Sequence, residues 1–276
     1  MIAFAYFGGK YRMIEDLLPM LPECDHYCEP FAGSLSILLN RRPSSIETAN
    51  DLNSDLTNFF RVLRTNGKKL VKSLQCTPYS REEFELAWIP CEDRTERARR
   101  FFIRVTMDIA KAGRKTDKSW SANTKFCPGE HSYAPANFIK KVKGLPEIVD
   151  RLRMVQIENR PALKVVKKFD HPNTLFYCDP PYIHETRSSK KDYLHEMSFD
   201  DHVELAEVLN ACKAMVALSG YDHPAMDDLY SAPKWYKHKF KSKQVPMSQG
   251  NGLVRQEVLW TNYDPAEKLG QLKLFT

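Results

Sequence analysis

The feature that most constrains this chain is an apolar stretch, NTLFYC (173–178), that leads directly into Asp-Pro-Pro-Tyr at 179–182. The apolar residues predict a buried strand. Two consecutive prolines fix the backbone and supply no N–H group, so they end the strand. Asp179 is therefore expected at the carboxyl end of a buried strand, which is where open α/β sheets bind their ligands.

Strand and helix patterns alternate before this motif. A short apolar run at 26–31, a turn of small residues and the helical pattern SILLN precede a second strand at 44–51. A helix with the sequence LTNFFRVLRTN follows, and we expect it to stop at Gly67. The order strand, helix, strand predicts parallel strands joined by a right-handed crossover.

The alternation resumes after residue 150. Strands are predicted at 154–159 and 214–221, and a helix capped by Asp200 is predicted at 200–213. The segments 234–243 and 255–263 indicate a terminal antiparallel pair. We therefore expect an α/β fold with a doubly wound, mostly parallel sheet of the Rossmann-like kind, interrupted by one basic helical insertion.

The positive charge of the chain is concentrated in its middle. Residues 64–150 contain 18 Lys and Arg against 11 Asp and Glu, whereas the rest of the chain contains 23 against 24. Helices are predicted at 81–89, 96–113 and 136–153, with a polar loop at 114–135. A basic segment beside a neutral body suits a polyanionic partner, although a solvated helical surface has the same composition.

Asp179, Pro180, Pro181 and Tyr182 suit a planar base that carries an amino group. The carboxylate and the neighbouring carbonyls form an edge of acceptors, and Tyr182 offers an aromatic face. Acceptors that take both N–H bonds turn the nitrogen lone pair towards an electrophilic methyl group. No strong base is required, because the amine gains acidity as it is alkylated. A proline turn after a strand explains the same residues, so the motif alone does not decide.

The turn EPFAGS (29–34) follows the first predicted strand. Small residues allow the backbone to approach a ligand closely. Gly33 is the single glycine of this turn, so the pattern is not the GxGxxG of phosphate binders. A ligand with a sulfonium and an amino acid tail fits it better than a pyrophosphate does.

NDLN (50–53) ends the second predicted strand. Asp51 lies about twenty residues after the glycine turn, where a carboxylate can accept both ribose hydroxyls of a nucleoside. Capping of the next helix is the other interpretation, above all for Asn53.

YFGGK (6–10) precedes the first predicted helix. Its two glycines permit a tight backbone, and Lys10 can pair with a carboxylate of a ligand. A plain glycine turn before a helix explains the same five residues.

These motifs, in the order YFGGK, EPFAGS, NDLN, DPPY, LSGY and EVLWTNY, resemble the DNA adenine methyltransferases of the Dam type. In that family the first two motifs precede a recognition insert and DPPY follows it. The resemblance covers nearly the whole chain and is weakest from about 70 to 135. Leu35 departs from it, because the family usually has a small residue there. The implied activity is site-specific transfer of a methyl group from S-adenosylmethionine to the N6 amine of a flipped adenine in double-stranded DNA.

The resemblance also implies roles for individual residues. Asp179, Pro180, Pro181 and Tyr182 would be catalytic and would hold the flipped adenine. The residues that would bind S-adenosylmethionine or shape its pocket are Tyr6, Lys10, Phe31, Gly33, Ser34, Asp51 and Asp179.

The resemblance divides the chain into two parts. Residues 1–66 and 145–276 would form the catalytic core, and residues 67–144 would form the inserted target-recognition region. Its candidates for DNA contact are Arg114, Lys115, Lys118, Trp120 and Asn123. Their side chains suit phosphate contacts, base-edge readout or filling of the helix after base extrusion. A cognate restriction nuclease, a phage genome and host regulation are all open as biological settings, and a monomer is the default.

Two other activities share these motifs. Methylation of the N4 amine of cytosine uses the same acceptor edge, although Asp at the first position of the motif favours adenine within these families. A non-catalytic nucleic-acid-binding module could keep the fold without the chemistry. Binding of DNA without binding of the cofactor would identify that module. The intact Asp51, Asp179 and Tyr182 argue against it.

Neither metal nor membrane is expected. The seven scattered cysteines do not predict a disulfide framework, and free thiols suit a reducing, cytoplasmic compartment. Cys24, His26 and Cys28 form the one grouping that hints at a metal, and a structural zinc site needs four protein ligands. The first twenty residues have charges and glycines where a signal peptide has an apolar run.

Overall fold

Seven strands form one sheet in the order β3-β2-β1-β4-β5-β7-β6. The computed structural model describes residues 1–6, 8–109, 119–122, 133–183, 196–240 and 256–267. The strands are β1 (His26–Glu29), β2 (Ile46–Asn50), β3 (Val155–Glu158), β4 (Thr174–Cys178), β5 (Met215–Tyr221), β6 (Tyr236–Lys239) and β7 (Glu257–Thr261). The strands β1 to β5 are parallel, and β7 is antiparallel to both β5 and β6. This confirms the predicted α/β sheet and its terminal antiparallel pair.

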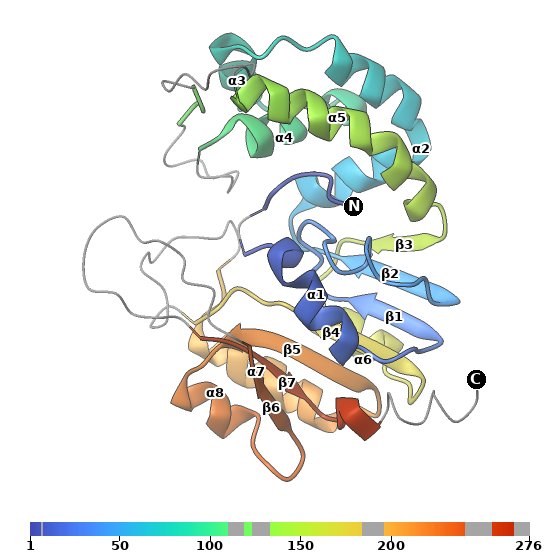
Figure 1. The fold of residues 1–276 in the computed structure, drawn as a ribbon, viewed down its shortest axis with the longest axis vertical. Coiled ribbons are helices and arrows are strands. Elements are labelled where there is room, and N and C mark those ends of the chain that lie inside the picture. Colours follow the sequence, from blue (N-terminus) through green and yellow to red (C-terminus); the bar gives the residue numbers. More distant parts are fainter. Residues whose placement is uncertain (7, 110–118, 123–132, 184–195, 241–255, 268–276) are drawn as a thin grey trace.

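Helices cover both faces of the sheet (Figure 1). The short segments η1 (Lys10–Met13), α1 (Ile14–Leu17) and η2 (Leu18–Met20) lie on one face, and α6 (Ala162–Phe169) and α7 (Phe199–Ala211) lie on the other. The remaining short helix is α8 (Pro224–Leu229). The order of strands and the two-sided cover are those of a doubly wound fold. In the part of the chain that the structure describes, no helix is long and apolar enough to cross a membrane.

Four further helices gather beside the β3 edge of the sheet (Figure 1). They are α2 (Ser54–Gln75), α3 (Arg81–Leu86), α4 (Arg94–Met107) and α5 (Tyr133–Leu152). An aromatic cluster joins α2 and α4 to the N-terminal segment, because Phe59 of α2 stacks on Phe102 of α4 and meets Phe4 edge-on, and the same buried cluster includes side chains of the sheet. All three side chains are buried. The core therefore continues from the sheet into the helical group, and each predicted domain boundary falls inside a helix, α2 or α5.

The expected helix end at Gly67 coincides with a kink in α2. Asn66 has a non-helical backbone, with φ −136° and ψ 33°, and helical residues resume after it and continue to Gln75. A Cβ atom on Gly67 would lie 2.9 Å from Cγ2 of Val149 in α5. Gly67 therefore follows a break in the helix and also permits close packing of α2 on α5.

The helix expected from SILLN is wrong, because residues 36–40 form successive turns. Leu35 has φ 57°, the left-handed region that favours glycine. Glu29 holds the turn by accepting a hydrogen bond from the Leu38 backbone at 2.8 Å. The left-handed backbone gives a physical reason why a small residue is usual at this position.

The end of α4 and the cap of α7 differ from expectation. Helix α4 ends at Met107 rather than at Gly113, because Asp108 is extended and pairs with Trp120 in an isolated bridge. Ser198, not Asp200, caps α7, and with Asp201 it forms a reciprocal capping box. The helices α6 and α8 were not predicted.

Candidate active site

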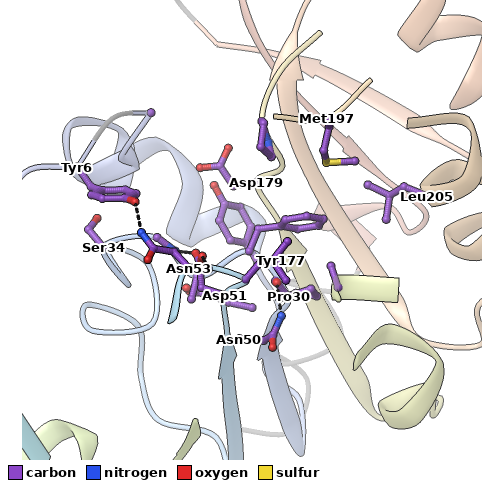
Figure 2. A pocket seen from close by; sticks show the side chains of 18 of the residues that line it. Tyr6, Pro30, Ser34, Asn50, Asp51, Asn53, Tyr177, Asp179, Met197 and Leu205 are labelled. Carbon is purple, nitrogen blue, oxygen red and sulfur yellow. Dashed lines mark hydrogen bonds between the residues drawn. The ribbon is translucent and has the colours of Figure 1, made fainter. Parts of the chain in front are cut away.

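A cavity of 370 Å³ opens at the carboxyl ends of β1, β2 and β4. All seven residues predicted to bind the cofactor line it: Tyr6, Lys10, Phe31, Gly33, Ser34, Asp51 and Asp179. Figure 2 shows Tyr6, Ser34 and Asp51 on one side of Asp179 and Met197 and Leu205 on the other. Pro181 also lines the cavity, whereas Pro180 and Tyr182 are buried and are not among its lining residues. The fold thus brings together residues as far apart in the sequence as Tyr6 and Asp179, because parallel strands end at one edge.

Asp51 joins the first two turns of the site. Its carboxylate accepts hydrogen bonds from the backbone N–H of Gly33 at 3.0 Å and of Asn53 at 2.8 Å. Gly33 has φ 47°, a conformation that a side chain would strain. The side chain of Asp51 therefore holds a bare stretch of backbone against the cavity.

Asn53 caps α2, as the capping interpretation expected. Its Oδ1 accepts from the backbone N–H of Asp55 at 3.0 Å and of Leu56 at 3.4 Å. Its Nδ2 donates to the Tyr6 hydroxyl at 3.2 Å (Figure 2). Burial, reinforced by the charge of Asp51, raises the pKa of Tyr6 far above its ordinary value. Tyr6 is therefore a neutral aromatic wall.

Asn50 was not predicted as a site residue, yet it connects three elements. Its Nδ2 donates to the carbonyl oxygens of Pro30 at 2.8 Å and Arg160 at 3.0 Å, and its Oδ1 accepts from the Arg160 N–H at 2.9 Å. The first of these bonds is visible in Figure 2. Asn50 thereby fixes the turn after β1 against the start of α6.

Lys10 lies between two carboxylates. Its Nζ is 2.8 Å from Oδ1 of Asp179 and 3.3 Å from Oε1 of Glu257, and it donates to the Gly8 carbonyl at 3.0 Å. The lysine is 6% exposed. Burial raises the pKa of Asp179 above its ordinary value, and the Lys10 charge opposes that rise. Lys10 therefore favours the ionised, hydrogen-bond-accepting form of Asp179.

Contacts from β5, β7 and α7 hold the rest of the DPPY turn, in which Pro180 and Tyr182 are buried and Pro181 is half-buried. The Tyr182 hydroxyl donates to Glu257, and its ring meets Tyr221 edge-on at a centroid distance of 4.6 Å. His202 of α7 donates from Nε2 to the Pro181 carbonyl at 2.9 Å. Long-range contacts thus hold the DPPY turn on both sides.

The ionisable side chains that line the cavity are mostly acidic. They are Glu29, Asp51, Asp179, Glu196, Asp201 and Glu204 against Lys10 and Arg160. An apolar wall completes the lining with Phe31, Pro161, Leu163, Met197 and Leu205. Such a surface favours a cationic ligand with an apolar or aromatic part and disfavours a pyrophosphate.

The family model of the D12 class N6 adenine-specific DNA methyltransferases matches residues 6–245. The chain belongs to this family. The methyltransferase therefore acts on the N6 amine of adenine in DNA and requires a methyl donor.

Relatives with assigned names match over most of the methyltransferase. The type II methyltransferase M1.LlaDCHI of Lactococcus lactis subsp. cremoris is 25% identical over 275 residues, which cover 93% of each chain. A DNA adenine methylase of Salmonella typhimurium is 24% identical, with 91% of this chain and 90% of the relative covered. A DNA adenine methylase of Vibrio cholerae is 43% identical over a shorter segment, 21% of each chain.

Glu29 was also not predicted as a site residue of the methyltransferase. It is 2% exposed and accepts hydrogen bonds from the Tyr27 hydroxyl at 2.9 Å and the Leu38 N–H at 2.8 Å. Burial raises the pKa of Glu29 to about 8, which favours its protonated form at neutral pH. The hydrogen bond from Leu38 indicates that Glu29 stabilises the turn after β1.

The predicted DNA-contact residues are placed only in part. Trp120 is half-buried, with the Arg81 guanidinium 4.8 Å from its ring centroid and the Tyr79 ring at 5.9 Å. Arg114, Lys115, Lys118 and Asn123 lie outside the described residues. Among the described residues, no group of three or more His, Cys, Asp or Glu side chains could hold a metal ion.

Proposed function

We propose that the methyl donor of this enzyme is S-adenosylmethionine and that it binds in the 370 Å³ cavity. The observation that carries the proposal is the junction of Asp51 with Gly33, which presents a carboxylate beside bare backbone at the ends of β1 and β2. When bound, S-adenosylmethionine supplies an electrophilic methyl group on a sulfonium. The acidic lining suits that positive charge, and the apolar wall suits the adenine ring of the donor.

Each lining residue has a role that its chemistry supports. Asp51 offers carboxylate oxygens to the ribose hydroxyls, as acidic residues do at this position in doubly wound folds. We assign the carboxylate of the methionine part to Lys10, a cation that lines the cavity. The residues that shape the pocket are Tyr6, Phe31, Gly33 and Ser34.

The DPPY turn orients the adenine amine. A base inside a duplex is inaccessible to the site, so the target adenine must be extruded. Asp179 and a neighbouring proline carbonyl then accept the two N–H bonds of the amine, and Tyr182 provides the aromatic surface behind them. Asp179 is suited to receive the proton that the amine loses on methylation, because burial raises its pKa.

We assign the DNA contact to the insertion, residues 67–144, and in particular to its polar loop at 114–135. The names of the relatives include a type II methyltransferase and DNA adenine methylases. Both a partner restriction nuclease and an unpartnered role are therefore compatible with the comparison. We keep the monomer as the expected state.

Calorimetric titration of the full chain with S-adenosylmethionine tests the donor assignment. Asp51→Asn should weaken binding by about 10- to 100-fold, because it removes a charged acceptor. Asp170→Asn is the matched control, since Asp170 accepts the backbone N–H groups of Lys213 and Ala214 at 2.8 and 2.9 Å, outside the cavity lining. Absence of binding by the wild-type protein, or equal affinity of both variants, would overturn the assignment.

A further inference from the structure

Glu257 and Tyr221 lie directly opposite one another in the antiparallel pair of β5 and β7. Side chains of directly opposed residues project from the same face of a sheet. The Tyr182 side chain contacts both residues, because its ring packs edge-to-face against Tyr221 and its hydroxyl donates to Glu257. The register of these two strands therefore determines where the ring of the DPPY turn lies.

Glu257 is also close to the lysine that holds Asp179. Its Oε1 is 3.3 Å from the Lys10 Nζ, and that Nζ lies 4.7 Å from the Tyr182 ring centroid. The Glu257 side chain is 18% exposed, so its charge is poorly solvated and depends on these two partners. Neither Glu257 nor Tyr182 lines the cavity. Glu257 thus contacts the catalytic turn and Lys10, but it does not itself line the proposed donor pocket.

We propose that Glu257 is a positioning residue for methyl transfer, which orients the Tyr182 ring by accepting the hydrogen bond of its hydroxyl. The inference rests on the proposed function, because the ring matters only if the target base packs against it. A ring held at its hydroxyl and at its edge cannot rotate away when the base enters. Loss of the acceptor leaves the ring with its contacts to Tyr221 and Lys10 but without a partner that fixes its hydroxyl, so the base is less well aligned for transfer.

The test measures kcat and the KM for S-adenosylmethionine, with tritiated methyl groups and DNA from a host that lacks adenine methylation. The variants are Glu257→Ala, Glu257→Gln, Tyr182→Phe and the double variant Tyr182→Phe/Glu257→Ala. Tyr263→Phe is the matched control, because this buried tyrosine donates its hydroxyl to the Met20 carbonyl at 2.9 Å, just beyond the other end of β7. We expect Glu257→Ala and Tyr182→Phe each to lower kcat by about 10- to 100-fold, with the cofactor KM within about twofold of wild type.

The double variant should be no slower than either single variant, because both changes remove one interaction. Glu257→Gln should recover most of kcat, since its amide oxygen still accepts the hydroxyl, and Tyr263→Phe should match wild type. Three results would overturn the inference and leave the proposed function intact. They are additive losses of kcat in the double variant, a wild-type kcat in Glu257→Ala, and a loss of kcat in Tyr263→Phe equal to that in Glu257→Ala. If Glu257→Ala fails to fold, the inference is tested by the other two variants: it requires a lowered kcat in Tyr182→Phe and a largely retained kcat in Glu257→Gln. A wild-type protein that binds donor but methylates no DNA would overturn the proposed function together with the inference.

Discussion

Replacement of Lys10 by methionine should destabilise the protein in a pH-dependent way. The lysine is the cation between Asp179, at 2.8 Å, and Glu257, at 3.3 Å. At an effective dielectric constant of about 20, a pair at this distance has a Coulomb energy of ~6 kcal/mol, part of which offsets the cost of burying the lysine. Removal of one partner from a buried pair typically costs ~3–5 kcal/mol, and we expect a loss of that size at pH 8.

The sign of the pH dependence follows from Asp179. Burial raises the pKa of this carboxyl in the folded protein, and loss of the opposing Lys10 charge raises it further. A raised folded pKa means that the folded state binds the proton more tightly than the unfolded chain, whose Asp pKa is about 3.9. Stability is then lost as the pH rises from that value through the folded pKa. The penalty of Lys10→Met should therefore be smaller at pH 5 than at pH 8.

Urea unfolding of both proteins at the two pH values measures the effect. Lys237→Met is the matched control, because Lys237 also lies between two carboxylates, Asp222 and Asp227, each at 2.6 Å but more exposed. Its loss should cost only ~0–1 kcal/mol. An equal penalty for Lys10→Met at pH 5 and pH 8, or one as small as that of the control, would refute the reasoning.

Two further predictions concern catalysis and DNA binding. Asp179→Ala should abolish methyl transfer, a loss of at least ~100-fold, with an unchanged circular dichroism spectrum, because it removes an acceptor at the reacting amine. Near-native activity of that variant in the labelled-methyl assay would contradict the mechanism. Replacement of Lys115 and Lys118 by alanine should weaken DNA binding and lower the slope of log affinity against log salt by about 2, as filter binding at several salt concentrations would show. An unchanged slope would place the phosphate contacts elsewhere.

Sequence patterns were sufficient to predict the site residues that lie at the carboxyl ends of neighbouring strands. Gly33, Asp51 and Asp179 each follow a short apolar run, and parallel strands bring such positions to one edge. The strand order could not be derived in the same way. It depends on packing among segments that are more than 100 residues apart.

The residues that sequence reasoning missed act through long-range contacts. Glu257 reaches the site only through the register of β5 and β7, and His202 only because α7 packs beside the Pro181 carbonyl. Asn50 stood within a recognised motif, but its link to Arg160 spans 110 residues. The turn at Leu35 was missed for a different reason. Its sequence has a local helical pattern, but Leu35 is left-handed and the Leu38 backbone donates a hydrogen bond to Glu29, which stabilises a turn instead.

The most direct test of the account is transfer of labelled methyl groups from S-adenosylmethionine to unmethylated DNA of mixed sequence, followed by nucleoside analysis of the product. The account predicts label in N6-methyladenine, and sequencing of the product would then map the recognised site. Label in N4-methylcytosine would contradict the assigned base. Absence of label despite bound donor would contradict the assigned DNA substrate.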